Sequence, residues 1–163
     1  LSPLYLNLLT LEPEQALYLP AGEMHAYLEG TALEIMANSD NVLRGGLTPK
    51  TVDLPELLAI LTFDTREPRV LTGRSDVACQ KAYPTEAREF ELSLVRVEEG
   101  ASFKPEPGRG VEILLGLEGS CVLKTDDAVE RPLGQGQSVF IPASLRGYSV
   151  EGTGRLARAI VPA

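Results

Sequence analysis

Hydrophobic and polar residues alternate along most of the chain, which is typical of β-strands that bury one face. The segment FELSLVRV, at positions 90–97, alternates cleanly, and VEILLGLEGSCVLKT, QSVFIPAS and RLARAIV follow it between turns rich in Gly, Pro and Asp. Shorter apolar segments occupy the first third of the chain, as LYLNLLTL, ALYLP, HAYLEG and ALEIMAN. Many short strands separated by regular turns predict a mainly β protein, built as a sandwich or a barrel.

One segment departs from this pattern. In VDLPELLAIL, at 52–61, Asp53 is followed three positions later by Glu56, which is the spacing of a capping box, and Pro55 is tolerated in a first helical turn. Leucines then recur at helical spacing, at Leu54, Leu57, Leu58 and Leu61. We therefore expect a short helix here, followed by a loop-rich connection and a second β-rich part.

Composition narrows the possible functions. The chain has 163 residues and 44% hydrophobic residues, which suffices for one domain or two small ones. Its net charge of −8 argues against a nucleic-acid partner, because phosphate contacts need clustered Lys and Arg. Cys79 and Cys121 lie far apart in sequence, so we expect two buried thiols in a reducing cytosol rather than a metal motif.

The ends and the apolar segments add a further expectation. No apolar stretch is long enough to cross a bilayer, and no secretory leader is present, so we expect a cytoplasmic protein that does not use a membrane. The chain starts at Leu1, without Met, directly in a strand-like pattern. We expect it to be a piece of a longer protein.

His25 is the only histidine, and it ends the pattern P-x-G-x-x-H formed with Pro20 and Gly22. A Pro-Gly turn followed by such a histidine resembles the second signature of the cupin barrel, in which the imidazole is a metal ligand at the barrel mouth. A lone histidine on a strand can equally be a hydrogen-bonded structural residue. One imidazole also cannot hold zinc, which needs three or four protein ligands. Any metal partners of His25 must therefore lie outside this segment.

A related pattern without histidine occurs in the second β-rich part. In GQSVFIPASLRG, Gly136 stands six residues before Pro142, and Ser144 takes the place of the second glycine. Arg146 and Gly147 surround the position where histidine would stand. This part therefore cannot form a conventional cupin metal site.

Two segments carry a more specific resemblance. HAYLEG, from His25, and LEIMANSDNVLRGGLTPK, which ends at Lys50, resemble an active-site segment of the type I phosphomannose isomerase (mannose-6-phosphate isomerase) family, with the spacing intact. The DLPELL helix is similar to one in that family, and the closing GTGRLARAIV resembles the terminus of its bacterial members. One departure is Glu14, where relatives commonly have Gly in a Pro-Gly turn.

The resemblance implies a fold and a domain organisation. We expect cupin-like (jelly-roll) β-barrels with one short helix between them. Residues 1–65 would be the C-terminal portion of the catalytic barrel together with the helix, and residues 66–163 a cupin-like domain without metal ligands. The N-terminal half of the enzyme would be the missing partner.

The resemblance also implies site residues. His25 corresponds to the family's fourth zinc ligand, and the other three, a Gln, a His and a Glu, belong to the N-terminal half. Arg44 corresponds to the active-site arginine, and Glu34 and Asp40 to acidic residues considered for proton transfer. Lys50, together with Tyr27, is assigned to binding the sugar phosphate substrate.

The implied reaction interconverts mannose 6-phosphate and fructose 6-phosphate by moving a proton between C2 and C1 through an enediol. Zinc and Arg44 would stabilise the negative charge on the sugar oxygens, whereas a protonated guanidinium is a poor base. Proton transfer therefore falls to Asp40 or Glu34. The alternative is a non-catalytic bicupin that binds a sugar or an anion and in which His25 is structural. In either case we expect the isolated chain to lack isomerase activity and to bind zinc weakly or not at all.

Overall fold

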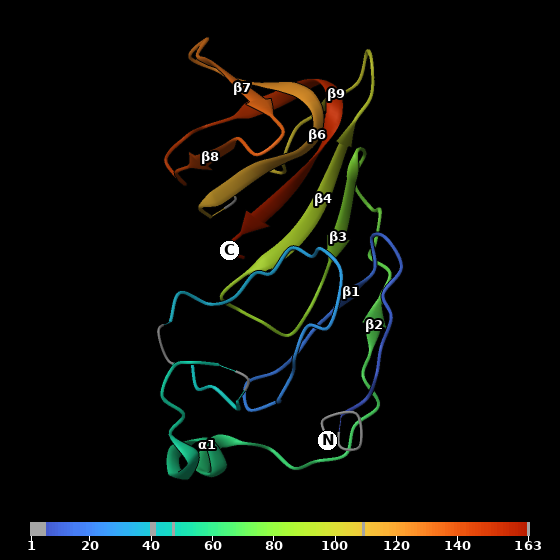
Figure 1. Ribbon diagram of the computed structural model, residues 1–163. Helices are drawn as coiled ribbons and strands as arrows, with labels where there is room; N and C mark the ends of the chain where they lie inside the picture. Colours follow the sequence, from blue (N-terminus) through green and yellow to red (C-terminus); the bar gives the residue numbers. More distant parts are fainter. Residues whose placement is uncertain (1–5, 40–41, 47, 109, 163) are drawn as a thin grey trace. The chain divides into compact units, whose positions relative to one another are not determined.

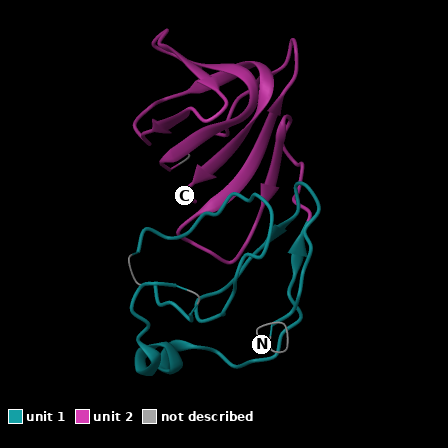
Figure 2. Cartoon of the chain, viewed as in Figure 1, with its two compact units in different colours: residues 1–71 teal, residues 72–163 magenta. Residues whose placement is uncertain are grey.

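A computed structural model describes residues 6–39, 42–46, 48–108 and 110–162, and most of the regular structure is β (Figure 1). The elements are β1 (Ala16–Leu17), α1 (Leu54–Ile60), β2 (Val70–Leu71), β3 (Gln80–Tyr83), β4 (Glu91–Val97), β5 (Ser102–Phe103), β6 (Glu112–Thr125), β7 (Glu130–Gly134), β8 (Ser138–Ile141) and β9 (Tyr148–Ile160). The chain divides into two units, residues 1–71 (unit 1) and residues 72–163 (unit 2) (Figure 2). No helix in the described residues is long and apolar enough to span a bilayer.

Unit 2 is an antiparallel sheet with the strand order β3-β4-β9-β6-β7, in which β5 pairs with β9 and β8 pairs with β6. The four strands expected from the alternating segments of this unit are all formed. Along β4 the exposed fraction alternates with the predicted period of two residues, but the buried side contains the polar Ser93 together with Val95 and Val97, and Leu92 and Leu94 lie on the other side. The connected core of the unit is made by Val95, Val97, Phe103, Leu114, Cys121, Leu123, Leu133, Ile141, Tyr148, Val150 and Leu156. The prediction of a mainly β, jelly-roll-like protein with one short helix is therefore confirmed.

The long strand β6 changes partner along its length. Its first residues pair with β8 and its later residues pair with β7. Gly116 lies between the two pairings, and a Cβ there would stand 2.1 Å from the Gly134 carbonyl oxygen. The Gly116 N–H donates to Gln137 O, and Gly116 O accepts from Gly136 N, both at 2.8 Å. Only glycine lets the β7–β8 turn approach this closely.

The cysteines behave only partly as expected. Both are free thiols. Cys121 is buried in the core of unit 2, whereas Cys79 is half-buried and packs against that core. The prediction of two buried thiols is confirmed for Cys121 alone.

Unit 1 contains the predicted helix. Asp53 is the N-cap of α1, and its side chain accepts a hydrogen bond from Glu56 N at 3.1 Å, while Pro55 lies in the first turn. The capping signal in the sequence is thus confirmed. Leu57 is the only buried residue of the helix, and Leu54 and Leu58 remain 58% and 59% exposed.

The strand predictions for unit 1 are mostly wrong. The structure has β1 inside the expected ALYLP segment, paired with β2. The described residues of the other three expected segments, 6–11, 25–30 and 32–38, form no strand. The reason is that a strand needs a neighbouring strand for its backbone hydrogen bonds, and the described residues of unit 1 provide only the two-residue β1–β2 pair.

The turn at Glu14 has the geometry expected of a glycine. Glu14 has φ 65°, in the left-handed region, and Gln15 N donates to Glu12 O at 3.0 Å. This is the conformation of the third residue in a type II turn after proline, where Gly is preferred. The substitution relative to the family pattern therefore leaves the turn in place, at the cost of backbone strain.

Candidate functional site

The turn before His25 is closed by a backbone hydrogen bond and is held against the end of α1. Glu23 N donates to Pro20 O at 3.4 Å, and Gly22 has φ +83° in this turn. The Gly22 carbonyl oxygen accepts from Thr62 N at 3.0 Å and from Thr62 Oγ1 at 3.2 Å, just beyond α1. A Cβ on Gly22 would stand 2.8 Å from the Ile60 carbonyl oxygen. The expected Pro-Gly turn is therefore formed, and the end of the helix fixes its position.

His25 is exposed, and its ring is oriented by its own backbone. Nδ1 lies 3.0 Å from the Glu23 carbonyl oxygen. Because a carbonyl oxygen only accepts, Nδ1 carries the hydrogen in this contact and Nε2 is left with its lone pair in the neutral ring. A metal-bound histidine commonly has this arrangement, in which one nitrogen donates to a carbonyl and the other binds the ion. The geometry of His25 thus fits the role of a metal ligand.

Tyr27 joins His25 to Glu34. The rings of His25 and Tyr27 meet edge to face, with centroids 5.9 Å apart, and the Tyr27 hydroxyl donates to Glu34 Oε1 at 2.8 Å. Although Tyr27 is 68% exposed, partial desolvation, the hydrogen bond to Glu34 and the charge of that carboxylate raise the pKa of Tyr27 to about 12. At neutral pH the hydroxyl therefore keeps its proton and acts as a donor.

Arg44 lies on a loop that packs beside the His25 segment. The backbone of Gly45 approaches Met24 so closely that a Cβ there would stand 2.3 Å from Met24 Cε. Met24 directly precedes His25, so the backbone that follows Arg44 lies against the side chain of the residue before the imidazole. The Arg44 side chain is exposed. Sequence reasoning missed the role of Met24, although the two glycines after Arg44 already indicated a close backbone approach.

The remaining predicted site residues are less closely connected. Lys50 is exposed, and its backbone N–H donates to Thr48 Oγ1 at 3.2 Å. Asp40 lies outside the described residues. The structure thus brings His25, Tyr27 and Glu34 together and packs Gly45, the residue after Arg44, against the Met24 side chain. Among the described residues, no contact ties Lys50 to this group.

The predicted site residues can supply one ligand of a metal site, His25. Within the described ranges, no group of three or more His, Cys, Asp or Glu side chains could hold a metal ion. Zinc in proteins takes three or four such ligands. The described part of this chain can therefore contribute His25, and a complete site needs ligands from elsewhere.

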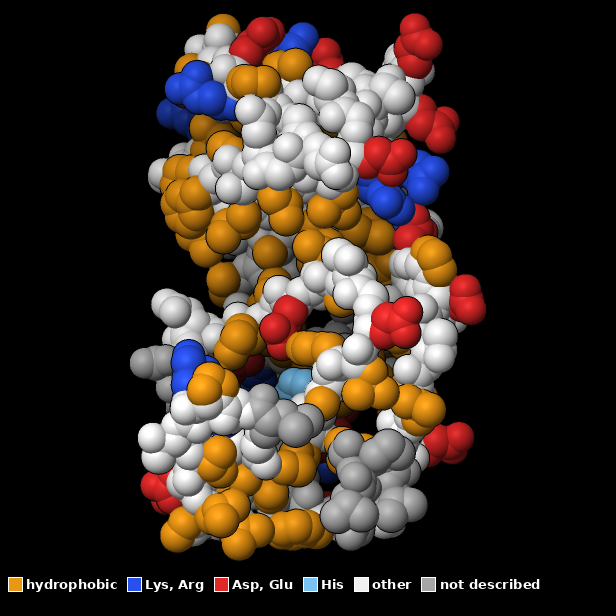
Figure 3. Space-filling model, in the orientation of Figure 1, with side chains coloured by type: hydrophobic (Ala, Val, Ile, Leu, Met, Phe, Trp, Pro, Cys, Tyr) orange, Lys and Arg blue, Asp and Glu red, His pale blue; other side chains and the backbone are white. Residues whose placement is uncertain are grey.

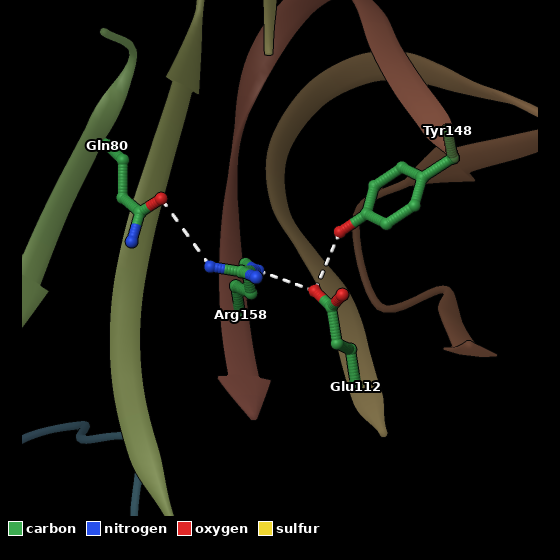
Figure 4. A network of polar contacts seen from close by, with 4 residues as sticks. All are labelled: Gln80, Glu112, Tyr148 and Arg158. Atoms are coloured by element: carbon green, nitrogen blue, oxygen red, sulfur yellow. Dashed lines mark hydrogen bonds and ion pairs between the residues drawn. The ribbon is translucent and has the colours of Figure 1, made fainter. Parts of the chain in front are cut away.

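In unit 2, Tyr148 directly follows the position where a cupin histidine would stand, and its side chain is buried in the core. There the Tyr148 hydroxyl donates to Glu112 Oε2 at 2.8 Å, and Arg158 Nε donates to the same oxygen at 2.5 Å (Figure 4). Arg158 Nη1 also contacts Gln80 Oε1 at 3.5 Å, and the guanidinium lies 5.6 Å from the centre of the Phe103 ring. Burial and the negative charge of Glu112 raise the pKa of Tyr148.

This interior network was missed in the sequence, although a signal existed. Glu112 and Arg158 have the same strand parity as the buried Leu114 and Leu156, so both face inward. The side-chain exposed fractions are 0% for Glu112 and 6% for Arg158. The interior of unit 2 thus contains an ion pair between the Arg158 guanidinium and the Glu112 carboxylate.

Comparison with known proteins gives a consistent result. The family model described as "Mannose-6-phosphate isomerase, cupin domain" matches residues 80–161. Mannose-6-phosphate isomerase of Salmonella typhimurium strain LT2 is 42% identical over 159 residues, which is 96% of this chain and 40% of that protein. Mannose-6-phosphate isomerase of Escherichia coli K12 is 39% identical over 158 residues, with the same two coverages.

Solved structures agree with the sequence comparisons. Crystal structures of two mutants of phosphomannose isomerase from Salmonella typhimurium match with TM-scores of 0.66 and 0.67 and identities of 32% and 33%. Each match covers 77% of this chain and 32% of the solved chain. The chain spans about 40% of the length of the curated relatives named above, and it corresponds to their C-terminal part. The predicted resemblance is confirmed, and the chain belongs to the mannose-6-phosphate isomerase family, of which it contains the cupin domain.

Proposed function

We propose that this chain is the C-terminal part of an enzyme that interconverts mannose 6-phosphate and fructose 6-phosphate, and that unit 1 contributes to its active site. The observation that carries the proposal is the His25 ring, whose Nδ1 is held by the Glu23 carbonyl so that Nε2 is available for a metal ion. The 42% identity to a mannose-6-phosphate isomerase extends over this segment, because the alignment includes 96% of the chain.

His25 is one zinc ligand in this proposal, and the other ligands come from the part of the enzyme that this chain does not contain. When bound, the zinc ion acts as a Lewis acid that stabilises negative charge on the sugar oxygens. The backbone contact of Nδ1 keeps the imidazole in one orientation and one tautomer, so the ligand does not need to reorganise on binding.

Arg44 stabilises charge and orients the sugar. The isomerisation removes a proton from C2 and delivers one to C1, and negative charge develops on the neighbouring oxygens. A guanidinium stays protonated at any relevant pH, so Arg44 supplies a fixed positive charge rather than a base. The packing of Gly45 against Met24 positions the loop that carries this charge.

Glu34 and Asp40 are the candidates for carrying the proton, and the contacts of Glu34 define how it is held. The Tyr27 hydroxyl donates to Glu34 Oε1, which leaves the second carboxylate oxygen to face a substrate. Because the pKa of Tyr27 is raised to about 12, Tyr27 remains a hydrogen-bond donor and does not compete as the base. Lys50 binds the phosphate in this proposal.

The experiment compares two alanine variants of the full-length enzyme, in which zinc is measured by mass spectrometry and turnover by a coupled isomerase assay. We expect Arg44→Ala to retain zinc and to have a kcat that is lower by a factor of about 10²–10³. We expect His25→Ala to lose both zinc and turnover. Arg69→Ala is the matched control, because Arg69 is also an exposed arginine of unit 1 and lies outside the proposed site.

Three outcomes would contradict the proposal. Arg44→Ala could lose zinc while turnover is retained, which would exclude an electrostatic role for Arg44. His25→Ala could retain both zinc and activity, which would make His25 a structural residue rather than a zinc ligand. The 163-residue chain alone could bind zinc tightly and stoichiometrically or isomerise the substrate, whereas we expect neither, because one ligand does not make a site.

A further inference from the structure

The outward-facing side of the sheet in unit 2 is apolar across four strands. The register pairs Leu92 of β4 with Ala159 of β9, Ala159 with Ile113 of β6, and Ile113 with Phe140 of β8. Residues directly opposite one another in a ladder point to the same side of the sheet, so these four form one continuous row. Ile113 is 49% exposed and Phe140 is 60% exposed.

A second apolar row lies beside the first. Leu94 pairs with Ala157, and Ala157 pairs with Leu115, one step further along the same strands. Ala157 is only 6% exposed but does not belong to the core cluster of the unit, as expected for a small residue between two leucines on the outer side. We refer to these two rows together as the outer apolar face.

The outer apolar face has a defined limit. Beyond the second row the same side of the sheet carries Arg96 opposite Arg155, and Arg155 forms an ion pair with Glu118 at 3.3 Å. An antiparallel sheet with one solvated face normally places polar residues on that face throughout. Here an apolar centre with a charged margin occurs instead, which is the composition of a protein interface.

We propose that the outer apolar face docks against the part of the full-length enzyme that this chain does not contain. Relatives are about 2.5 times longer than this chain, so a large polypeptide in the same molecule is available. A segment that is linked covalently acts at a high effective concentration, which favours it over a second copy of the chain. This proposal rests on the additional polypeptide that the longer relatives contain. It does not depend on which residue transfers the proton.

Unit 1 supports this occupant. Leu57 is its only buried large apolar side chain among the described residues, while Leu8, Leu28 and Phe63 are each more than 70% exposed. Unit 1 therefore lacks cover for its own apolar residues, and hydrophobic side chains are visible on the face of this unit drawn in Figure 3. The same additional polypeptide accounts for the uncovered apolar residues of both units.

The test introduces single thiols into the full-length enzyme by Phe140→Cys and Ile113→Cys. Val129→Cys is the matched control, because Val129 is 41% exposed in the turn between β6 and β7. The rate of maleimide labelling at each position is measured by peptide mass spectrometry, which separates the new thiols from Cys79 and Cys121. Circular dichroism checks the fold of each variant, and light scattering gives its oligomeric state.

We expect positions 113 and 140 of the full-length enzyme to label at least about tenfold more slowly than position 129, at every protein concentration. In the 163-residue chain we expect all three positions to label at similar rates. Equal rates in the full-length enzyme would overturn the proposal. Protection that increases with concentration would identify a second copy as the occupant, and concentration-independent protection in the 163-residue chain would identify unit 1, so either result would also overturn it.

Discussion

The buried pair of Arg158 and Glu112 provides the sharpest test of the structure. In the variant Arg158→Met the flexible methionine fills much of the space of the arginine, but Glu112 loses the cation that neutralises it. The Glu112 side chain is 0% exposed, so its charge cannot be solvated without opening the sheet. Removing one partner of such a buried pair costs about 3–5 kcal/mol in the free energy of unfolding.

The assay is urea unfolding of the protein followed by far-ultraviolet circular dichroism, which reports on the strands of unit 2. For a domain of this size, each kcal/mol of lost stability lowers Tm by about 4–8 °C, so a thermal melt should show the same loss. The control is Lys124→Met, because Lys124 forms ion pairs with Glu151 and Glu130 on the surface. We expect little change there, since solvent screens exposed pairs.

The double variant Glu112→Leu/Arg158→Met distinguishes pairing from packing. When both charges are replaced by apolar side chains, no unpaired charge remains, and most of the stability lost in Arg158→Met should return. Two results would refute this reasoning. One is a loss below about 1 kcal/mol in Arg158→Met, as for a surface pair. The other is a double variant as unstable as the sum of the two single variants.

Three further predictions concern pH, strain and close packing. The pKa of Tyr148 is raised above its ordinary value of 10.0, so the folded state keeps the proton to a higher pH than the unfolded chain does. The free energy of unfolding should therefore fall as the pH rises above 10.0. In Tyr148→Phe, the free energy of unfolding measured against pH should decline less. Glu14→Gly should raise the free energy of unfolding by about 1 kcal/mol, because it relieves the φ of 65°; a lower urea midpoint would contradict this. Gly116→Ala should lower the free energy of unfolding by about 1–3 kcal/mol or more, because its Cβ would overlap the Gly134 carbonyl oxygen. Gly134→Ala is the control, because a Cβ there meets only the Gln137 side chain, at 3.4 Å. Equal melting temperatures for the two variants would contradict the prediction and show that the backbone around Gly116 can relax.

Local pattern predicted those elements whose causes are local. The N-cap at Asp53 needs only the side chain of one residue and the N–H of another three positions away, so the helix could be identified from the sequence. Four strands of unit 2, β4, β6, β8 and β9, could be identified because one of their faces is buried, and burial imposes a period of two residues. In HAYLEG the same type of pattern misled, because apolar residues there form no ladder among the described residues.

The family, the helix, the strands β4, β6, β8 and β9 and the Pro-Gly turn before His25 could be predicted from the sequence, because each depends on neighbouring residues or on a contiguous motif. The short strands β3, β5 and β7 were missed. Three contacts became apparent only from the three-dimensional structure: Tyr27 binds Glu34, Met24 packs against Gly45, and Arg158 neutralises Glu112. The last two residues are 46 positions apart in the chain. Their meeting depends on the pairing register of β6 with β9, and register is set by the packing of the whole sheet rather than by any local pattern.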